Sequence, residues 1–309
     1  MEGGAGHMEE TRAGSPVAAV VPSLNPTRQL TSTVEGLLAA GFARVILVND
    51  GSRPETEEYF QELDRLPQVT LLTHPVNRGK GAAMKTAFTW LLEHWPDCPG
   101  VVTVDGDGQH HPEDALACAQ KMLAEERVIL GCRDFSRPEV PPRSRTGNRI
   151  TRGVFRVFCG MSLSDTQTGL RAVPRRYLEE LTAVAGDRYE YETNMLLALK
   201  QRRIPWGEMK IRTIYLEENR GSHFHPVRDS WKIYRLILAH FFRYTLSSVV
   251  SAVADTGLFG LLSALLAGVL AGAALTAAAT AGARALSSLL NFSLNRWVVF
   301  QSKGPLGRS

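Results

Sequence analysis

The chain contains few cysteines, and their spacing matches no paired-cysteine motif. Its 309 residues include four, at positions 98, 118, 132 and 159, with no CxxC pair and no Cys/His spacing of the kind that holds zinc. This scatter argues against a disulfide framework and indicates a reducing compartment. Residues 1–16 hold no apolar run, so the sequence predicts no cleavable signal peptide, and we expect residues 1–15 to be a disordered leader.

An excess of one charge sign is also missing. The formal net charge is only +4, and no long basic run occurs, which argues against nucleic acid as a partner. One basic group does stand out, shortly before an apolar segment: Arg220, Arg228, Lys232, Arg235 and Arg243. Basic residues beside a membrane span are retained on the cytoplasmic side, so this group predicts a cytoplasmic front domain.

Charged residues almost disappear near the C-terminus. Residues 244–283 contain one charge, Asp255, whereas residues 17–217 mix charged and apolar residues evenly. A membrane span needs roughly 20 apolar residues. We therefore expect a membrane module over 244–301, with about two spans and a tail over 302–309; a three-span reading remains open. Arg284 would fall inside the second span, where a charge is costly, and Asp255 is its candidate partner.

The segment before the spans has a different pattern. Residues 227–243 place aromatic and aliphatic residues largely on one helical face and basic residues on the other. This pattern predicts an amphipathic helix in the headgroup region of a membrane. The alternative is a core helix of the soluble domain.

The front of the chain alternates short apolar runs with amphipathic stretches. The expected strands are residues 17–21, 45–48, 69–73, 101–104 and 127–130, and the expected helices between them are 30–40, 54–66, 81–94 and 112–126. Such alternation predicts an α/β domain, over residues 16–226, with a mostly parallel sheet covered on both faces. Ligands of these sheets bind at the carboxyl ends of the strands.

The clearest chemical signal is the segment VVTVDGDGQHH at residues 101–111. Asp105 and Asp107 follow an apolar strand and are two residues apart, so both carboxylates project to one side. Such a pair suits Mg²⁺ or Mn²⁺, whose coordination is commonly completed by substrate phosphates, and Gln109 offers a further oxygen. The alternative is an ordinary polar turn rich in Asp and Gly.

Three other polar segments fall at expected strand ends or helix starts. They are Pro22-Ser23-Leu24-Asn25, Val48-Asn49-Asp50-Gly51-Ser52 and Asn77-Arg78-Gly79-Lys80-Gly81. Asp50 could accept hydrogen bonds from a base or ribose, and Lys80 at a helix N-terminus would favour phosphate. The spacing of a P-loop is absent.

In this order and spacing, VPSLN, VNDGS, NRGKG and VDGDGQH resemble family 2 glycosyltransferases, in the dolichyl-phosphate mannosyltransferase-like branch, over roughly residues 15–240. The resemblance implies a GT-A fold, a nucleotide-sugar donor, a divalent cation and an inverting transfer. It implies donor binding by Pro22, Asn25, Asp50, Lys80 and Asp105, and metal binding by Asp105, Asp107 and Gln109. Pro26 departs from the branch, which usually has an acidic residue there.

The resemblance continues on the acceptor side. Gly131-Cys132-Arg133, the Ser-Arg-x-x-Asn segment containing Arg145, Asp165–Arg171 and Asn219-Arg220-Gly221-Ser222 resemble further signatures of the branch. They imply that Arg133, Arg145, Arg220 and Ser222 hold an acceptor phosphate, and guanidinium groups suit such a ligand. The catalytic candidates are Asp107, Asp165, Arg133 and Arg145. Asp165 is given a supporting role.

Residues 241–260 and 289–300 resemble the first half of the GtrA-like membrane family. We therefore expect transfer of a hexose to a polyprenyl phosphate, undecaprenyl or dolichyl, by a multi-pass protein of the inner membrane with a cytoplasmic catalytic domain. The alternative is a module that flips lipid-linked sugars, with a front domain that only senses nucleotide sugar. A third possibility, a nucleotidyltransferase, lacks a Gly-rich activation loop. Small residues in the spans predict a homo-oligomer.

Overall fold

The structure is a computed structural model that describes residues 15–137, 140, 142–212 and 226–295, and for Arg143 and residues 226–244 it describes the backbone alone. The chain divides into two compact units, residues 1–229 and 230–309. The domain boundaries expected from the sequence stay predictions. The expected tail, and the expected leader up to residue 14, lie outside the described residues.

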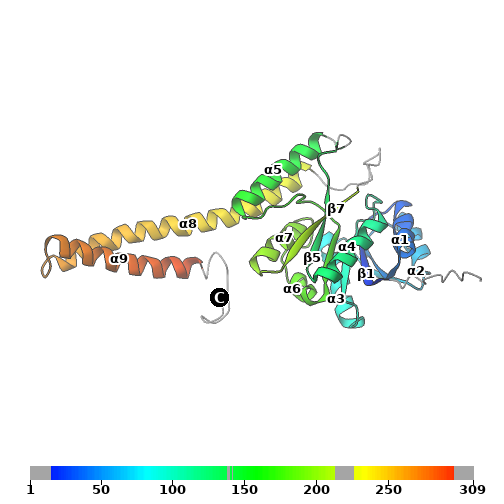
Figure 1. Ribbon diagram of the computed structural model, residues 1–309, viewed down its shortest axis with the longest axis horizontal. Helices are drawn as coiled ribbons and strands as arrows, with labels where there is room; N and C mark the ends of the chain where they lie inside the picture. The colour runs from blue at the N-terminus through cyan, green and yellow to red at the C-terminus, as the bar shows by residue number, and fades with distance from the viewer. Residues whose placement is uncertain (1–14, 138–139, 141, 213–225, 296–309) are drawn as a thin grey trace, which may run out of the picture. The chain divides into compact units, whose positions relative to one another are not determined.

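The described part of the first unit contains seven strands and seven α-helices (Figure 1). The strands are β1 (Ser15–Ser23), β2 (Phe42–Asp50), β3 (Val69–His74), β4 (Gly100–Thr103), β5 (Val128–Arg133), β6 (Arg171–Pro174) and β7 (Trp206–Ile211). The helices are α1 (Gln29–Ala40), α2 (Glu57–Asp64), α3 (Lys80–His94), α4 (Pro112–Glu125), α5 (Pro142–Phe158), α6 (Leu178–Thr182) and α7 (Glu190–Gln201), with short 3₁₀ turns η1 (Pro54–Thr56) and η2 (Arg175–Tyr177).

The strands form one sheet in the order β3-β2-β1-β4-β6-β5-β7. Neighbouring strands are parallel except where β6 pairs antiparallel with both β4 and β5. The expected mostly parallel α/β sheet is therefore confirmed.

Strand β6 was not expected from the sequence. It has four residues and ends at Pro174, so it is too short to show the alternation that marks a strand. Its identity as a strand comes from its neighbours, because Ala172 pairs with Val102 of β4 and with Ile129 of β5. The insertion matters for the site, because it brings the segment before β6 beside the end of β4.

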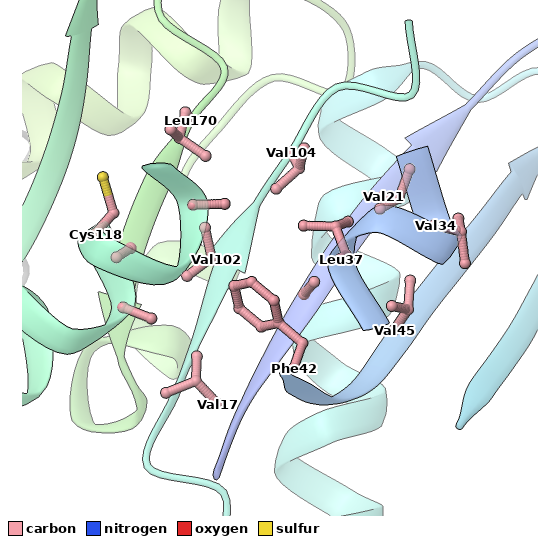
Figure 2. Close-up of a cluster of buried hydrophobic side chains, with 14 of the residues drawn as sticks. Val17, Val21, Val34, Leu37, Phe42, Val45, Val102, Val104, Cys118 and Leu170 are labelled. Carbon is pink, nitrogen blue, oxygen red and sulfur yellow. The ribbon is translucent and has the colours of Figure 1, made fainter. Parts of the chain in front are cut away.

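Alternation along the strands explains how both sheet faces are covered. On β1, Val17, Ala19 and Val21 join a buried cluster with Val34 and Leu37 of α1 (Figure 2). The intervening Ala18 and Val20 are also fully buried, so they belong to the opposite face. Helices α1 and α4 contact each other on the face of the sheet that this cluster covers. Helix α3 instead contacts β1, β2, α6 and α7. An apolar strand buried on both faces is what a parallel sheet requires.

Helix α8 begins at Pro226, among the last residues of the first unit, and continues to Leu266 in the second unit, which also contains α9 (Gly272–Leu294). Residues 227–243 and the first span are thus one continuous helix, because no Gly or Pro interrupts residues 227–256. Thr245–Leu266 and Gly272–Leu294 are long and apolar enough to cross a membrane, and only 6% and 17% of their most apolar windows are buried. A core helix of a soluble protein would be mostly buried, so the exposure favours a membrane environment.

Polar side chains gather between α8 and α9. Arg284 Nε lies 3.6 Å from Asp255 Oδ2, and Ser287 Oγ donates to Asp255 Oδ1 at 2.8 Å. Ser251, one helical turn before Asp255 on α8, is buried. One turn further back, Ser247 Oγ donates to the side-chain oxygens of Asn291 and Asn295. The sequence-based pairing of Asp255 with Arg284 is confirmed.

Candidate active site

The chemistry-bearing segments meet at one edge of the sheet. Because β3, β2, β1 and β4 are neighbouring parallel strands, their carboxyl ends lie side by side. Pro22 is the second-to-last residue of β1, Asp50 ends β2, and Asp105 follows β4 by two residues. The segments that the sequence predicts to form the site therefore lie next to one another at this end of the sheet, and their function stays a prediction.

Asp50 holds the loop that precedes α3. Its carboxylate accepts hydrogen bonds from the backbone N–H groups of Arg78, at 2.9 Å, and Gly79, at 2.7 Å. The same group lies 2.7 Å from His74 Nδ1, and His74 Nε2 lies 2.9 Å from Thr86 Oγ1. Both Asp50 and His74 are buried. Asp50 thus fixes the shape of the Asn77–Gly81 loop, and its contact with a nucleoside stays a prediction.

Asn25 joins the loops that follow β1 and β2. It has a positive φ of 49°, a conformation that Asn tolerates better than most residues. Its side-chain oxygen accepts from the Arg53 N–H at 2.8 Å, and its own N–H donates to Ser52 Oγ at 2.9 Å. The two loops are thereby held together.

Lys80 connects the start of α3 to two carboxylates. Its Nζ lies 2.6 Å from Asp105 Oδ1 and 2.9 Å from Glu192 Oε1 on α7. Although burial acts to lower it, the pKa of Lys80 is raised because these two negative charges lie so close. Lys80 therefore keeps its positive charge beside the carboxylate pair.

Asp105 and Asp107 differ in their surroundings. Burial acts to raise the pKa of Asp105, but the Lys80 ammonium and His110 hold it well below its usual range. The pKa of Asp107 is raised, first by burial and then by the negative charge of Asp105. Asp107 Oδ1 accepts the Gln109 N–H at 3.1 Å, which shapes the turn. The two carboxylates therefore concentrate negative charge at the end of β4.

Asp105 is confined by its neighbours. A Cβ built on Gly169 would lie 2.3 Å from Asp105 Oδ2, so the backbone before β6 packs directly against this carboxylate. On another side, His110 Nε2 lies 3.6 Å from Asp105 Oδ2, and His110 is only 9% exposed. His110 Nδ1 is buried without a hydrogen-bond partner in the described part of the chain.

Arg133 and Asp165 form a two-pronged ion pair. Arg133 donates from Nε at 2.7 Å and from Nη2 at 3.1 Å to the two oxygens of Asp165, which is fully buried. Asp165 also accepts the Gln167 N–H at 3.0 Å. Through these contacts Asp165 holds the segment that leads to Gly169 in place. They also occupy two of the side-chain nitrogens of Arg133.

The structure shows fewer contacts for the other residues that the sequence predicts to bind the acceptor. Arg145 on α5 donates from Nη2 to the carbonyl oxygen of Arg137 at 2.9 Å, and its buried Nε has no partner among the described residues. Arg220 and Ser222 lie outside the described residues. Phosphate binding by these residues stays a prediction.

The sequence predicted no role for three residues of this candidate site: Glu192, His74 and Arg171. Glu192 belongs to no motif and reaches Lys80 only because α7 packs on α3. His74 could have been found, because it ends β3 directly opposite Asp50 in the parallel register. Arg171 is 1% exposed and donates to the Glu192 carbonyl oxygen at 2.8 Å, while its Nη2 has no partner in the described structure.

Comparison with curated proteins finds relatives over most of the chain. A UDP-N-acetylglucosamine–dolichyl-phosphate N-acetylglucosaminyltransferase of Methanococcus voltae is 28% identical over 240 residues, covering 71% of this chain and 94% of the relative. Glycosyltransferase AglJ of Haloferax volcanii is 26% identical over 250 residues, covering 78% of each.

Solved structures with the same fold include two sugar-phosphoglycerate synthases. Glucosyl-3-phosphoglycerate synthase from Mycobacterium tuberculosis, in complex with Mn²⁺, UDP and glucosyl-3-phosphoglycerate, has a TM-score of 0.54 at 16% identity, covering 74% of this chain and 78% of that one. Mannosyl-3-phosphoglycerate synthase from Rubrobacter xylanophilus has a TM-score of 0.55 at 15% identity, covering 74% of each chain. These likenesses show the fold of the first unit and confirm the expected GT-A architecture.

A family profile adds the remaining evidence. Residues 18–182 match the family described as Glycosyl transferase family 2, and this match contains most of β1, all of β2 to β6 and the Asp105–Asp107 segment. The match covers more than half of the chain. The chain therefore belongs to glycosyl transferase family 2 and is a glycosyltransferase.

Proposed function

We propose that this glycosyltransferase moves a hexose from a nucleoside-diphosphate sugar to the phosphate of a polyprenyl lipid, with inversion at the anomeric carbon. The observation that carries the donor half is the meeting of Asp105, Asp107 and Lys80 at the carboxyl edge of the sheet. A carboxylate pair beside an ammonium group suits a diphosphate bound together with a cation.

The lipid acceptor is supported by two independent features. The Methanococcus voltae relative is named for transfer to dolichyl phosphate. This chain also carries two mostly exposed apolar helices long enough to span a membrane. A membrane-attached enzyme meets its lipid acceptor by diffusion in two dimensions, so the spans and the acceptor class agree.

A divalent cation, Mg²⁺ or Mn²⁺, fits the residues present. Asp105 and Asp107 supply the hard oxygen ligands that these ions prefer, and their mutual repulsion would be relieved by an added positive charge. Within the described ranges, no cluster of three or more His, Cys, Asp or Glu side chains could hold a metal alone. The two carboxylates would therefore hold the cation weakly by themselves, and the donor diphosphate would complete the coordination, with Gln109 as a further candidate ligand. Bound there, the cation would neutralise charge that develops on the leaving diphosphate.

The protein's own contribution is positioning. In the proposed reaction an acceptor phosphate oxygen forms a bond to the anomeric carbon, while the bond from that carbon to the donor diphosphate breaks. Attack from the side opposite the leaving group gives inversion. Because the acceptor oxygen is already ionised at neutral pH, no general base is required, and Arg133, Arg145, Arg220 and Ser222 are proposed to orient it.

The proposed location follows from the charge pattern of the sequence. Arg243 and Arg296 flank the two spans on what would be one side of the membrane. We propose a multi-pass protein of the inner cell membrane with its catalytic unit on the cytoplasmic face, where nucleotide sugars are made.

The test is a donor screen with the purified full-length protein in detergent. UDP-glucose, UDP-N-acetylglucosamine and GDP-mannose are each supplied with a polyprenyl phosphate, and release of nucleoside diphosphate and formation of glycolipid are measured. We expect turnover that requires the lipid phosphate and stops with EDTA. Turnover with 3-phosphoglycerate but not with lipid would contradict the acceptor. Binding of donor without release of nucleoside diphosphate, in every lipid tested, would support the sensor alternative instead.

A further inference from the structure

One lysine serves two carboxylates at the centre of the site. Lys80 Nζ is within 3 Å of both Asp105 Oδ1 and Glu192 Oε1, at 2.6 and 2.9 Å. All three side chains are largely buried, with 20%, 29% and 16% of their surfaces exposed. Little water can therefore substitute for a lost partner of any of them.

The proposed metal would need the same carboxylate that Lys80 now holds. A divalent cation on Asp105 and an ammonium group 2.6 Å from that carboxylate repel each other strongly at low dielectric. One of the three groups must therefore move when the cation arrives.

Asp105 is poorly placed to move. Gly169 lies against its carboxylate so closely that a Cβ there would be 2.3 Å from Oδ2, and His110 stands 3.6 Å away on another side. Lys80 has a flexible four-carbon side chain and three donors, so it can change partner with small rotations.

Glu192 provides the place to which Lys80 can move. Its helix is fixed at this point, because its backbone carbonyl accepts a hydrogen bond from buried Arg171 at 2.8 Å. Lys80 can therefore leave Asp105 and keep an ion pair with Glu192, so its buried charge is never left without a partner.

We infer that Lys80 and a divalent cation compete for Asp105, and that Glu192 is a positioning residue that retains Lys80 when the cation binds there. This inference rests on the proposed function, because it assumes a cation at Asp105. It concerns cation binding, which precedes catalysis. In this step Glu192 acts through Lys80 and contacts neither the metal nor the donor.

The test measures Mn²⁺ affinity of the full-length protein without donor, from the free-Mn²⁺ signal in electron paramagnetic resonance. Lys80→Met should tighten binding roughly tenfold, because no competing ammonium has to leave Asp105. Glu192→Gln should weaken binding roughly tenfold, because Lys80 then has Asp105 as its main partner. Matched controls on the same helices are Lys85→Met, which loses an ion pair with Asp187, and Glu190→Gln, which removes the negative charge of a side chain that accepts from loop N–H groups. Both controls should leave the affinity near that of wild type.

The double variant decides between a relay and a simple charge effect. If Glu192 acts through Lys80, adding Glu192→Gln to Lys80→Met changes nothing, and the double variant binds Mn²⁺ as tightly as Lys80→Met. If Glu192→Gln weakens binding equally in both backgrounds, Glu192 acts directly on the cation and the inference is wrong. Weaker binding by Lys80→Met, with an unchanged circular dichroism spectrum, would also overturn it.

Failure of the proposed function would look different. In that case Asp105→Asn and wild type would bind Mn²⁺ equally, or neither would bind it, whatever stands at position 80. A normal loss of binding in Asp105→Asn, together with no effect of Lys80→Met, would leave the metal site standing and refute only the exchange.

Discussion

The backbone of Gly169 lies directly against the carboxylate of Asp105, although 64 positions separate them in the chain. The contact exists because β6 inserts antiparallel beside β4, so the residues preceding β6 pass the end of β4. Thr103 Oγ1 donates to the Gly169 carbonyl oxygen at 2.7 Å and secures this passage.

Gly169→Ala should therefore disable the site while leaving most of the fold intact. The new methyl group must displace Asp105, and a misplaced catalytic group costs about 100-fold in rate. The measurement is nucleoside-diphosphate release under saturating donor, with thermal unfolding recorded in parallel. Gly153→Ala on α5 is the control, because nothing lies within 4 Å of its Cβ position. Equal activity of the two variants would show that Asp105 tolerates the shift.

Asp107→Ala should abolish transfer. The change removes a charged candidate ligand at the end of β4, and we expect a fall of at least about 100-fold in turnover. Asp107→Asn should be similarly inactive but at least as stable as wild type, because it removes a half-buried charge that Asp105 repels. Turnover and melting temperature are compared with those of Asp97→Ala, an exposed control. Near-wild-type turnover with saturating Mg²⁺ or Mn²⁺ would remove Asp107 from the metal site.

Arg133→Ala should destabilise the first unit. It leaves the fully buried Asp165 carboxylate without its two-pronged partner, which costs about 3 kcal/mol in the free energy of unfolding. The double variant Arg133→Ala, Asp165→Ala should recover part of that loss, because the unpaired charge is gone. Denaturant unfolding measures both. Additive losses in the double variant would mean that the pair contributes little.

Arg220→Ala should raise the apparent KM for the lipid phosphate far more than the KM for the nucleotide sugar. This prediction rests on the sequence, since Arg220 lies outside the described residues. Steady-state kinetics with either substrate varied provide the measurement, and Arg65→Ala, at an exposed position beyond α2, is the control. A rise confined to the KM for the nucleotide sugar would mean that Arg220 binds the donor and not the acceptor phosphate.

The membrane unit is expected to form a homo-oligomer. Within the described pair of helices, Asp255 is covered by Arg284 and Ser287, but the Arg284 side chain remains 74% exposed. An exposed charge costs about 2.5 to 3.5 kcal/mol at the centre of a span, and a second copy could cover it. Mass measurement in mild detergent should show more than one chain, and Arg284→Leu should shift that mass toward the monomer. A fully active wild-type monomer would contradict the expectation.

Much of the fold follows from local patterns in the sequence. The parallel strands β1 to β5 are short apolar runs bounded by Gly, Pro, Asn and Asp, and each lies where the alternation predicts. Because carboxyl ends of parallel strands share one edge, the placement of Asn25, Asp50 and Asp105 together also follows from the sequence. The same is true of the pairing of Asp255 with Arg284, since charges inside spans need partners.

Tertiary structure decided what these residues touch. Strand β6 is too short for any periodicity, so its antiparallel insertion and the approach of Gly169 to Asp105 arise only from pairing with β4 and β5. Glu192 carries no motif, and it reaches Lys80 because α7 packs on α3. Periodicity and spacing describe one segment at a time. The partner of a buried charge, however, comes from a segment distant in the chain. Such a partner is needed because a charge removed from water is stable only beside an opposite charge.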